Sequence, residues 1–393
     1  MKLRLGTIFT VAALTLGVGL GMTASASTST KSTPKQDVAK AKQALAPYLK
    51  APTDLPNATT LPKAPAAGQT VVYLVCDNPN CTLNSTNIEK AATALGWNYK
   101  AIPFKLADTS TLISAMDSAL QFDPAFVMFT GVPEAAWAGE IPKYKAAGVG
   151  LVPTVSGTYK PDATILGYAN DKEYTAALID ALGNWFIQDS GGTGHAMVMR
   201  FNEVPQAALF ADKYKKFVEK NCSQCTVDLV DINNQQLASQ ASASVTASAV
   251  QANPSITHVV APVPSATNGL RQALSTIGRD NIKISGYLGQ YQQFANIEAG
   301  TDSAWVSQSR GAQGYNYIDT GLHGMAGKKY QYKTDTYAPI MLVTKDNIAS
   351  LGGANAAKAT NDFPIPSNYA DLYSALWKLK SASTSATTQT TQK

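Results

Sequence analysis

Short apolar runs alternate with segments of helical spacing along the first part of the chain, from residue 70 to residue 154. After the first run, apolar residues recur at Ile88, Ala91 and Leu95, which lie on one face of a helix. Gly96 then ends this helix, because glycine tolerates the left-handed conformation of a helix C-cap. The pattern predicts strands at 71–75, 97–104, 125–129 and 150–155, and further helices at 111–120 and 134–147.

The alternation starts again beyond Tyr168. A helix is expected at 173–189, where Leu178, Leu182 and Phe186 share one face. Strands are then predicted at 195–201, 226–232, 256–263 and 282–288, with connecting helices at 206–220, 235–252 and 266–277. Alternating strands and helices of this length predict an α/β fold of two doubly wound, parallel-sheet units that are joined near Ala169.

The two ends of the chain differ from this α/β pattern. Residues 1–26 carry two basic residues, an apolar span and an Ala-Ser-Ala ending at Ala26, which predicts a signal peptide that is cleaved to leave a soluble protein. The alternative is a retained membrane anchor. Residues 27–69 are expected to hold an Ala-rich helix and a proline-rich tether, and residues 381–393 a disordered tail.

Composition and motifs narrow the classes of function. Charged residues make up 15% of the 393 residues and the net charge is +5 without a basic cluster, which argues against nucleic-acid binding. The sequence lacks the nucleophile-elbow, P-loop and dinucleotide-binding glycine motifs. His195, His258 and His323 are far apart, and each is expected to be a structural or surface residue. We therefore expect no cofactor and no catalytic site.

The four cysteines fall into two close pairs, Cys76 with Cys81 and Cys222 with Cys225. An even number of cysteines in an exported chain favours two local disulfides. A zinc site and a redox-active Cys-x-x-Cys are the alternatives. Cys222 follows a predicted helix instead of opening one, which is unfavourable for redox chemistry. Because no cysteine precedes Cys76, a lipid-modified N-terminus is not expected.

The order of elements and several local sequences resemble the type I periplasmic solute-binding proteins of ABC importers, in the ribose- and galactose-binding branch. The similar stretches are GWNYKAIPF, ALQFDPAFVMFTG and KAAGVGLVPT in the first unit, and NIEAGTDSAWVSQS and GYNYIDTGLHGMAGKKY late in the chain. The resemblance implies two α/β lobes that are joined by three hinge crossings, with a small-molecule ligand held between them.

The same resemblance implies boundaries and partners. Lobe 1 would comprise 70–169 and 303–329, including a strand at 305–309, and lobe 2 would comprise 170–302 and 330–380. The implied partner is the membrane permease of an ABC importer. The protein would act as a monomer in the periplasm or outside the cell.

Ligands of doubly wound sheets bind beyond the carboxyl ends of the strands, so the candidate contacts can be named. The candidates in lobe 1 and at the first crossing are Asp77, Asn78, Asn80, Thr130, Gly131, Trp137, Thr154, Ser156, Asn170 and Asp171. Those in lobe 2 are Arg200, Phe201, Asn202, Pro264, Tyr287, Gln290 and Tyr291, and the resemblance adds Gln308. For each Asn or Asp, capping a loop or turn is the alternative role.

The class of ligand stays open. Sugar-binding members of the family typically carry an Asp in the loops that here read APVPS (261–265) and GYLGQ (286–290), and neither loop has an acid. Phe201, Tyr287 and Tyr291 suit stacking on a ring. Arg200 would favour a carboxylate or phosphate if it pointed into the cleft, and would otherwise be a surface ion-pair partner.

We therefore predict a receptor for a sugar-like molecule or for an aromatic or heterocyclic compound, which it delivers to an ABC importer. A ligand-presenting component of a membrane sensor and a secreted enzyme on the same fold are the alternatives.

Overall fold

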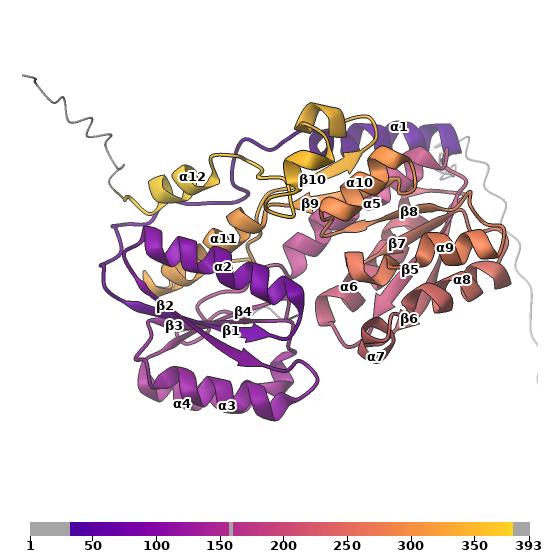
Figure 1. Cartoon of the computed structure of the whole chain (residues 1–393). Helices are drawn as coiled ribbons and strands as arrows, with labels where there is room; N and C mark the ends of the chain where they lie inside the picture. Colours follow the sequence, from indigo (N-terminus) through magenta and orange to yellow (C-terminus); the bar gives the residue numbers. More distant parts are fainter. Residues whose placement is uncertain (1–31, 157–159, 380–393) are drawn as a thin grey trace, which may run out of the picture. The chain divides into compact units, whose positions relative to one another are not determined.

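The computed structural model describes residues 32–156 and 160–379, and its first sheet contains four parallel strands. These strands are β1 (Thr70–Cys76), β2 (Asn98–Phe104), β3 (Phe126–Thr130) and β4 (Gly150–Thr154), in the order β2-β1-β3-β4. Figure 1 shows one face covered by α2 (Pro79–Ala94) and α11 (Arg310–Met325), and the other by α3 (Thr109–Leu120) and α4 (Ile141–Ala147). We call this unit lobe 1.

Strand alternation builds a core on each face of this sheet. Val71 and Tyr73 belong to the cluster beneath α2 and α11, whereas Val72 and Leu74 belong to the cluster beneath α3. All four side chains are fully buried. Because helices cover both faces, the strands β1, β3 and β4 read as nearly continuous apolar runs, and this is why the sequence pattern locates them well, whereas the edge strand β2 is largely exposed.

The second sheet has six strands and defines lobe 2. Its strands are β5 (His195–Phe201), β6 (Thr226–Ile232), β7 (His258–Ala261), β8 (Lys283–Tyr287), β9 (Ala304–Gln308) and β10 (Ile340–Thr344), in the order β10-β9-β8-β7-β5-β6. Only β10 is antiparallel to its neighbour. One face packs against α1 (Pro34–Leu45), α5 (Lys172–Asp189) and α6 (Pro205–Asn221), and the other against α8 (Ser242–Ala252), α9 (Leu270–Thr276) and α10 (Tyr291–Ala299). The predicted fold class is confirmed.

The strand predicted at 305–309 belongs to lobe 2 and not to lobe 1. It forms β9, in which Val306 is in register with Tyr287 of β8, and Gln308 with Ile340 of β10. The chain therefore changes lobes after Gln308 and not near Ser303. There the Ser309 hydroxyl accepts the N–H of Ala312 and caps α11.

Two further segments, one near each end of the chain, also have defined positions. The N-terminal helix α1 continues into η1 (Ala46–Leu49), and beyond them Leu61 packs in the lobe 1 core. Near the other end, α12 (Tyr369–Leu376) packs on α11 with Trp377, so this part of 330–380 lies on lobe 1. The predicted signal peptide at 1–26 and tail at 381–393 lie outside the described residues. No helix in the described ranges has the length and apolarity needed to cross a membrane.

Two predicted helices are interrupted. The segment 134–147 begins with the short turns η2 (Glu134–Ala136) and η3 (Ala138–Glu140), and α4 starts only at Ile141, with Pro142 in its first turn. The segment 235–252 is divided into α7 (Asn234–Ala238) and α8, because Gln240 has a left-handed backbone with φ of 60°. The remaining short turns are η4 (Pro264–Thr267), η5 (Ile348–Leu351) and η6 (Ala354–Ala357).

Candidate functional site

A cavity of about 140 Å³ lies where the carboxyl ends of strands from both sheets meet. Each of the strands from β1 to β8 except β6 contributes a residue at its carboxyl end or in the loop that follows, as expected for doubly wound sheets, and after β6 the contribution comes from α7 (Asn234–Ala238). Its lining residues are Cys76, Asn78, Asn80, Cys81, Asn84, Leu106, Thr130, Gly131, Val155, Asn170, Tyr174, Phe201, Val204, Gln206, Ala207, Asn234, Leu237, Pro262, Val263, Tyr287, Leu288, Arg310, Gln313 and Tyr317.

The loop after β1 supplies the first polar groups. The Asn78 side chain accepts the backbone N–H of Asn80 (2.9 Å) and caps the start of α2. The Cys76–Cys81 disulfide bridges this loop, with the two Cα atoms 5.5 Å apart. The Asn80 Oδ1 atom then accepts hydrogen bonds from Gln290 Nε2 of lobe 2 and from Arg310 Nη2, each at 3.2 Å. Asn80 therefore joins side chains from both lobes at the cavity.

The first two turns of α11 carry a polar network along one side of the cavity. Arg310 Nη1 donates to Gln313 Oε1 (3.1 Å), and Gln313 Nε2 donates to Tyr317 Oη (2.9 Å) and Gln308 Oε1 (3.3 Å). Asn170 completes the network, since its Nδ2 atom donates to Tyr317 (3.1 Å) and its Oδ1 atom accepts from Gln308 (3.4 Å). These bonds hold the amide and guanidinium groups in fixed directions.

Electrostatically, the described lining carries a single ionised side chain, Arg310. Asp and Glu do not occur among these residues, and both cysteines are in the disulfide. Burial raises the pKa of Tyr317 to about 12 and raises the pKa values of Tyr174 and Tyr287 well above the usual phenol value. The three phenols are therefore neutral, and the cavity has a net positive charge.

The lobe 2 side of the cavity is mostly apolar. Its apolar lining side chains are Phe201, Val204, Ala207, Leu237, Pro262, Val263 and Leu288. Tyr287 is also fully buried, donates its hydroxyl to Gln206 Oε1 (3.3 Å) and meets Tyr174 edge to face with 6.5 Å between ring centroids. A ligand here would meet hydrogen-bonding groups on one side and hydrocarbon on the other.

Seven of the residues predicted from the sequence line the cavity: Asn78, Asn80, Thr130, Gly131, Asn170, Phe201 and Tyr287. Gln290 and Gln308 do not line it themselves but hydrogen-bond to Asn80 and Asn170, which do. The two predicted disulfides, Cys76–Cys81 and Cys222–Cys225, are both formed. Ligand contact itself remains a prediction for all of these residues.

Two predicted contacts lie elsewhere for clear physical reasons. Trp137 is completely buried in the lobe 1 core, where its ring centroid is 5.1 Å from that of Phe129 and its N–H donates to Val132 O (3.3 Å). Arg200 forms a two-point ion pair with Asp231 (2.7 and 3.1 Å) and a further bond to Asp212 (3.1 Å). Its guanidinium is thus a surface ion-pair partner, which was the alternative role.

The other predicted residues also lie outside the cavity lining. Asp77 accepts the backbone N–H of Leu106 (3.1 Å), and Asp171 accepts the hydroxyl of Ser156 (3.4 Å). Tyr291 lies under the Lys358 ammonium group, 5.7 Å from its ring centroid. Thr154 and Pro264 are buried in the protein, and Asn202 is exposed. Most of these residues therefore hold a loop or lie in the protein interior instead of facing the cavity.

The cavity residues on α11 were not predicted from the sequence. Arg310, Gln313 and Tyr317 are spaced by three and four positions, so they lie on one face of a helix. This face is polar although the helix around it is buried: Arg310 is only 3% exposed. A polar stripe at the start of a buried helix was the signal in the sequence.

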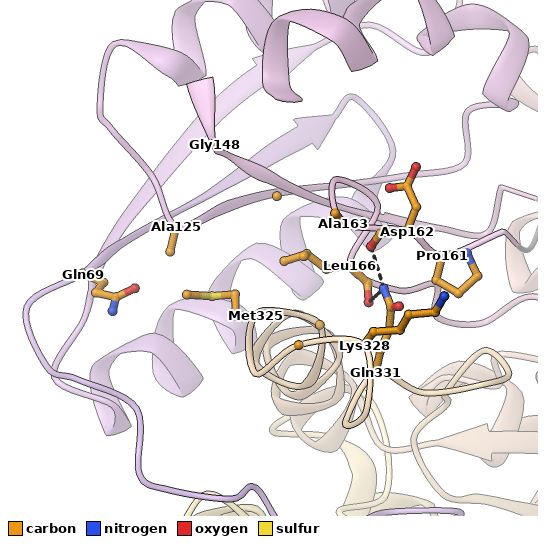
Figure 2. A pocket seen from close by; sticks show the side chains of 13 residues that line it. Gln69, Ala125, Gly148, Pro161, Asp162, Ala163, Leu166, Met325, Lys328 and Gln331 are labelled. Atoms are coloured by element: carbon orange, nitrogen blue, oxygen red, sulfur yellow. Dashed lines mark hydrogen bonds between the residues drawn. The ribbon is translucent and has the colours of Figure 1, made fainter. Parts of the chain in front are cut away.

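A second, larger cavity of about 750 Å³ lies at the opposite edge of the lobe 1 sheet. Figure 2 shows Gln69, Ala125 and Gly148, which precede β1, β3 and β4, on its wall. The Gln331 amide donates to the carbonyls of Asp162, Ile165 and Leu166 at 2.9–3.0 Å, so it holds a loop and is not offered to a ligand. The smaller cavity is therefore the better candidate site.

Comparisons with known proteins agree with this fold. The family model for the periplasmic binding protein domain matches residues 71–329. An ABC sugar transporter subunit from Rhodobacter sphaeroides 2.4.1 has a TM-score of 0.59 at 19% identity, over 72% of this chain and 99% of that chain. A solute binding protein of an ABC transporter from Mycobacterium smegmatis, with bound glycerol, has a TM-score of 0.62 at 15% identity, over 73% and 98%.

A periplasmic ribose ABC transporter structure from Conexibacter woesei DSM 14684 has a TM-score of 0.57 at 17% identity, over 76% of this chain and 99% of that chain. No curated protein matches the sequence. At these identities the solved structures show the fold, whereas the family model covers well over half of the chain. The type I architecture predicted from the sequence is confirmed, and the chain belongs to the periplasmic binding protein domain family.

Proposed function

We propose that the protein is an exported receptor that captures one small organic molecule in the cavity between its lobes and passes it, unchanged, to an ABC importer. The observation that carries this proposal is the convergence of the carboxyl-end loops of both sheets on one cavity. Fixed hydrogen-bonding groups on α11 and in the loop after β1 face an apolar wall from lobe 2.

The lining also supports binding without chemistry. Among the described lining residues there is no histidine, lysine, aspartate or glutamate, and the cysteines form a disulfide. A general base matched to neutral pH is thus missing from this set of residues. Delivery to a permease and a location outside the cytoplasm are supported by the family and by the signal-peptide pattern at 1–26.

The proposal is tested by mass spectrometry of small molecules released when the purified protein is denatured, followed by titration of each compound into ligand-free protein. We expect one compound to bind with one molecule per chain and to be recovered with unchanged mass after prolonged incubation. Steady conversion of that compound would contradict the proposal in favour of an enzyme.

A further inference from the structure

The position and contacts of Arg310 bear on the chemical class of the ligand. Arg310 is the first residue of α11, is 3% exposed and lines the cavity. Its guanidinium donates to two neutral amide oxygens, those of Asn80 and Gln313. A guanidinium has five N–H donors, so these two bonds leave donors for a ligand.

Carboxylates in the neighbourhood are engaged with other groups. Asp362 accepts the backbone N–H of Arg310, and Asp335 accepts the N–H groups of Asp171 (2.8 Å), Glu173 (2.8 Å) and Tyr174 (3.4 Å) at the start of α5. In the described part of the chain, no ion pair is formed by the Arg310 guanidinium.

A buried cation that no carboxylate contacts directly is costly. Asp362, the acidic side chain whose charge acts on Arg310, bonds to its backbone N–H and not to its guanidinium. Desolvating a charged side chain costs several kcal/mol, and an opposite charge with good hydrogen-bond geometry is what repays that cost. Such a cation at the wall of a cavity is best compensated by a negatively charged group on the ligand. The planar guanidinium matches a carboxylate, which can accept two parallel hydrogen bonds from it.

The charge of the site favours one negative charge over two. Arg310 is the single ionised side chain of the described lining, and the Asp362 carboxylate already occupies the first N–H of α11. A dianionic phosphate would meet one cation and a capped helix end. The lobe 2 wall of the cavity is formed by Phe201, Val204 and Leu237 with other apolar residues, which would pack against hydrocarbon.

From this geometry we infer that the ligand is a small organic monocarboxylate with an apolar or aromatic body, whose carboxylate pairs with Arg310. The inference rests on the proposed receptor function and narrows its ligand class. Neutral sugars fit less well, because a sugar brings no negative charge to the guanidinium and places hydroxyl groups against the apolar wall.

The inference is tested with the full-length mature protein and matched pairs of compounds. Calorimetric titration compares benzoate, 3-phenylpropionate and aliphatic monocarboxylates with their neutral amides, and with ribose and glucose. For the acid that binds, we expect its amide to bind about 10- to 100-fold more weakly, because a charge-assisted hydrogen-bond pair is lost.

Two arginine variants separate recognition from folding. Arg310→Met should remove the preference for acid over amide, and Arg310→Lys should retain part of it, because lysine keeps the charge without the planar fork. Arg200→Met removes an arginine that pairs with Asp231 at the surface and should leave the preference intact. Unchanged circular dichroism and melting would show that each variant is folded.

The outcomes separate the inference from the proposed function. Tight binding of a neutral sugar, unaffected by Arg310→Met, would overturn the carboxylate inference and leave the receptor function standing. If no small molecule co-purifies and neither acids, amides nor sugars bind, the receptor function fails and the inference fails with it. An acid preference that Arg310→Met leaves intact would also overturn the role of Arg310.

Discussion

Asp319 is a buried carboxyl on α11 that links two other segments of the chain. Its Oδ2 atom accepts the Tyr332 hydroxyl (2.7 Å), and its Oδ1 atom accepts the Trp377 indole N–H (2.8 Å). Burial raises the pKa of Asp319 to about 7, whereas an aspartate in an unfolded chain has a pKa of about 3.9. The folded state therefore holds this proton more tightly. The resulting stabilisation is complete below about pH 4 and is lost as the pH rises through about 7.

The Asp319→Asn variant should lose this pH dependence. Each pKa unit of displacement corresponds to about 1.4 kcal/mol, so Asp319 should lower the free energy of unfolding by a few kcal/mol between pH 4 and pH 7. Asparagine keeps an acceptor for Trp377 and offers a donor to Tyr332. Urea unfolding at several pH values should therefore show that the free energy of unfolding of the variant increases relative to that of the wild type as the pH rises.

A second buried group, His323, changes stability with pH in the opposite direction. The pH profile of the wild type alone therefore does not isolate the effect of Asp319, and the variant must be compared with it. Burial lowers the pKa of His323 to about 4, so its contribution to stability is lost as the pH falls from about 6.5 through about 4. His323 stacks on Tyr332, with 4.4 Å between ring centroids. The exposed Asp346→Asn change serves as the control. If both asparagine variants followed the wild-type pH profile, the raised pKa of Asp319 would be wrong.

Arginine chemistry illustrates what the sequence could and could not predict at the residue scale. Arg200 was the candidate for binding an anion, but Arg200 and Asp231 are register partners on β5 and β6 and satisfy each other. Arg310 was not considered, although it lines the cavity that Arg200 was expected to reach. Pairing across strands and the burial of a helix face both depend on tertiary contacts, which a single sequence does not specify.

At the scale of elements, apolar periodicity predicted where most strands and helices lie but not which sheet each strand joins. The apolar run that forms β9 would suit either sheet. Its hydrogen-bonded pairing with β8 and β10 places it in the sheet of lobe 2. The helix α12 was missed because it is short and follows turns. Tertiary packing on α11 stabilises it, and local propensity alone is weak over so few residues.

This packing predicts a large effect for Trp377. Its side chain is completely buried, stacks on Tyr315 with 5.5 Å between ring centroids and donates to Asp319. Trp377→Ala should lower the free energy of unfolding by about 3 to 5 kcal/mol, as buried aromatic truncations do. Trp377→Phe keeps the stacking and should cost less. Urea unfolding measures both, and a loss below about 1 kcal/mol for the alanine variant would show that α12 is not firmly packed.

The two disulfides should affect stability alike and binding differently. The Cys76–Cys81 bridge encloses Asn80 of the cavity, whereas Cys222–Cys225 follows α6. Replacing either pair by alanine should cost about 2 kcal/mol of stability, given such short rings. Only the replacement of Cys76 and Cys81 should weaken ligand binding. Without this bridge the Asn80 loop is less ordered in the ligand-free protein, so ordering it on binding costs more conformational entropy.

Free-thiol titration of the unfolded, unreduced wild type checks the premise of this prediction and should find no thiol. Calorimetric titration of the two double variants with the same compound then provides the comparison. Equal affinity of the 76/81 variant and the 222/225 variant would show that the first bridge has no role in ordering the site.

At the scale of the molecule, several segments connect the two sheets. The first and third crossings pair with each other, since Asn170 N–H donates to Thr336 O (2.8 Å) and Thr336 N–H to Tyr168 O (3.1 Å). Asn170 has a left-handed backbone there, with φ of 58°. Beyond the three predicted crossings, the segment between η1 and Leu61 and the one before α12 also run from one lobe to the other. These additions were not predictable, because their anchoring residues lie in stretches without clear periodicity.

The last prediction is that ligand binding both stabilises the molecule and makes it more compact. Groups from both lobes line the cavity, and Gln290 of lobe 2 already donates to Asn80 of lobe 1, so a ligand gains most when both lobes contact it. At 100 times its dissociation constant, a ligand should add about 2.7 kcal/mol to the free energy of unfolding, which raises the melting temperature by several degrees.

Small-angle scattering should then show a smaller radius of gyration with saturating ligand than without it. Arg310→Met under the same conditions is the matched control, because it should bind the ligand too weakly to change either quantity. A clear rise in melting temperature with unchanged dimensions would mean that the ligand binds to lobes that do not move. In that case the two additional connections, between η1 and Leu61 and before α12, are the segments to alter next, since they also link the two lobes.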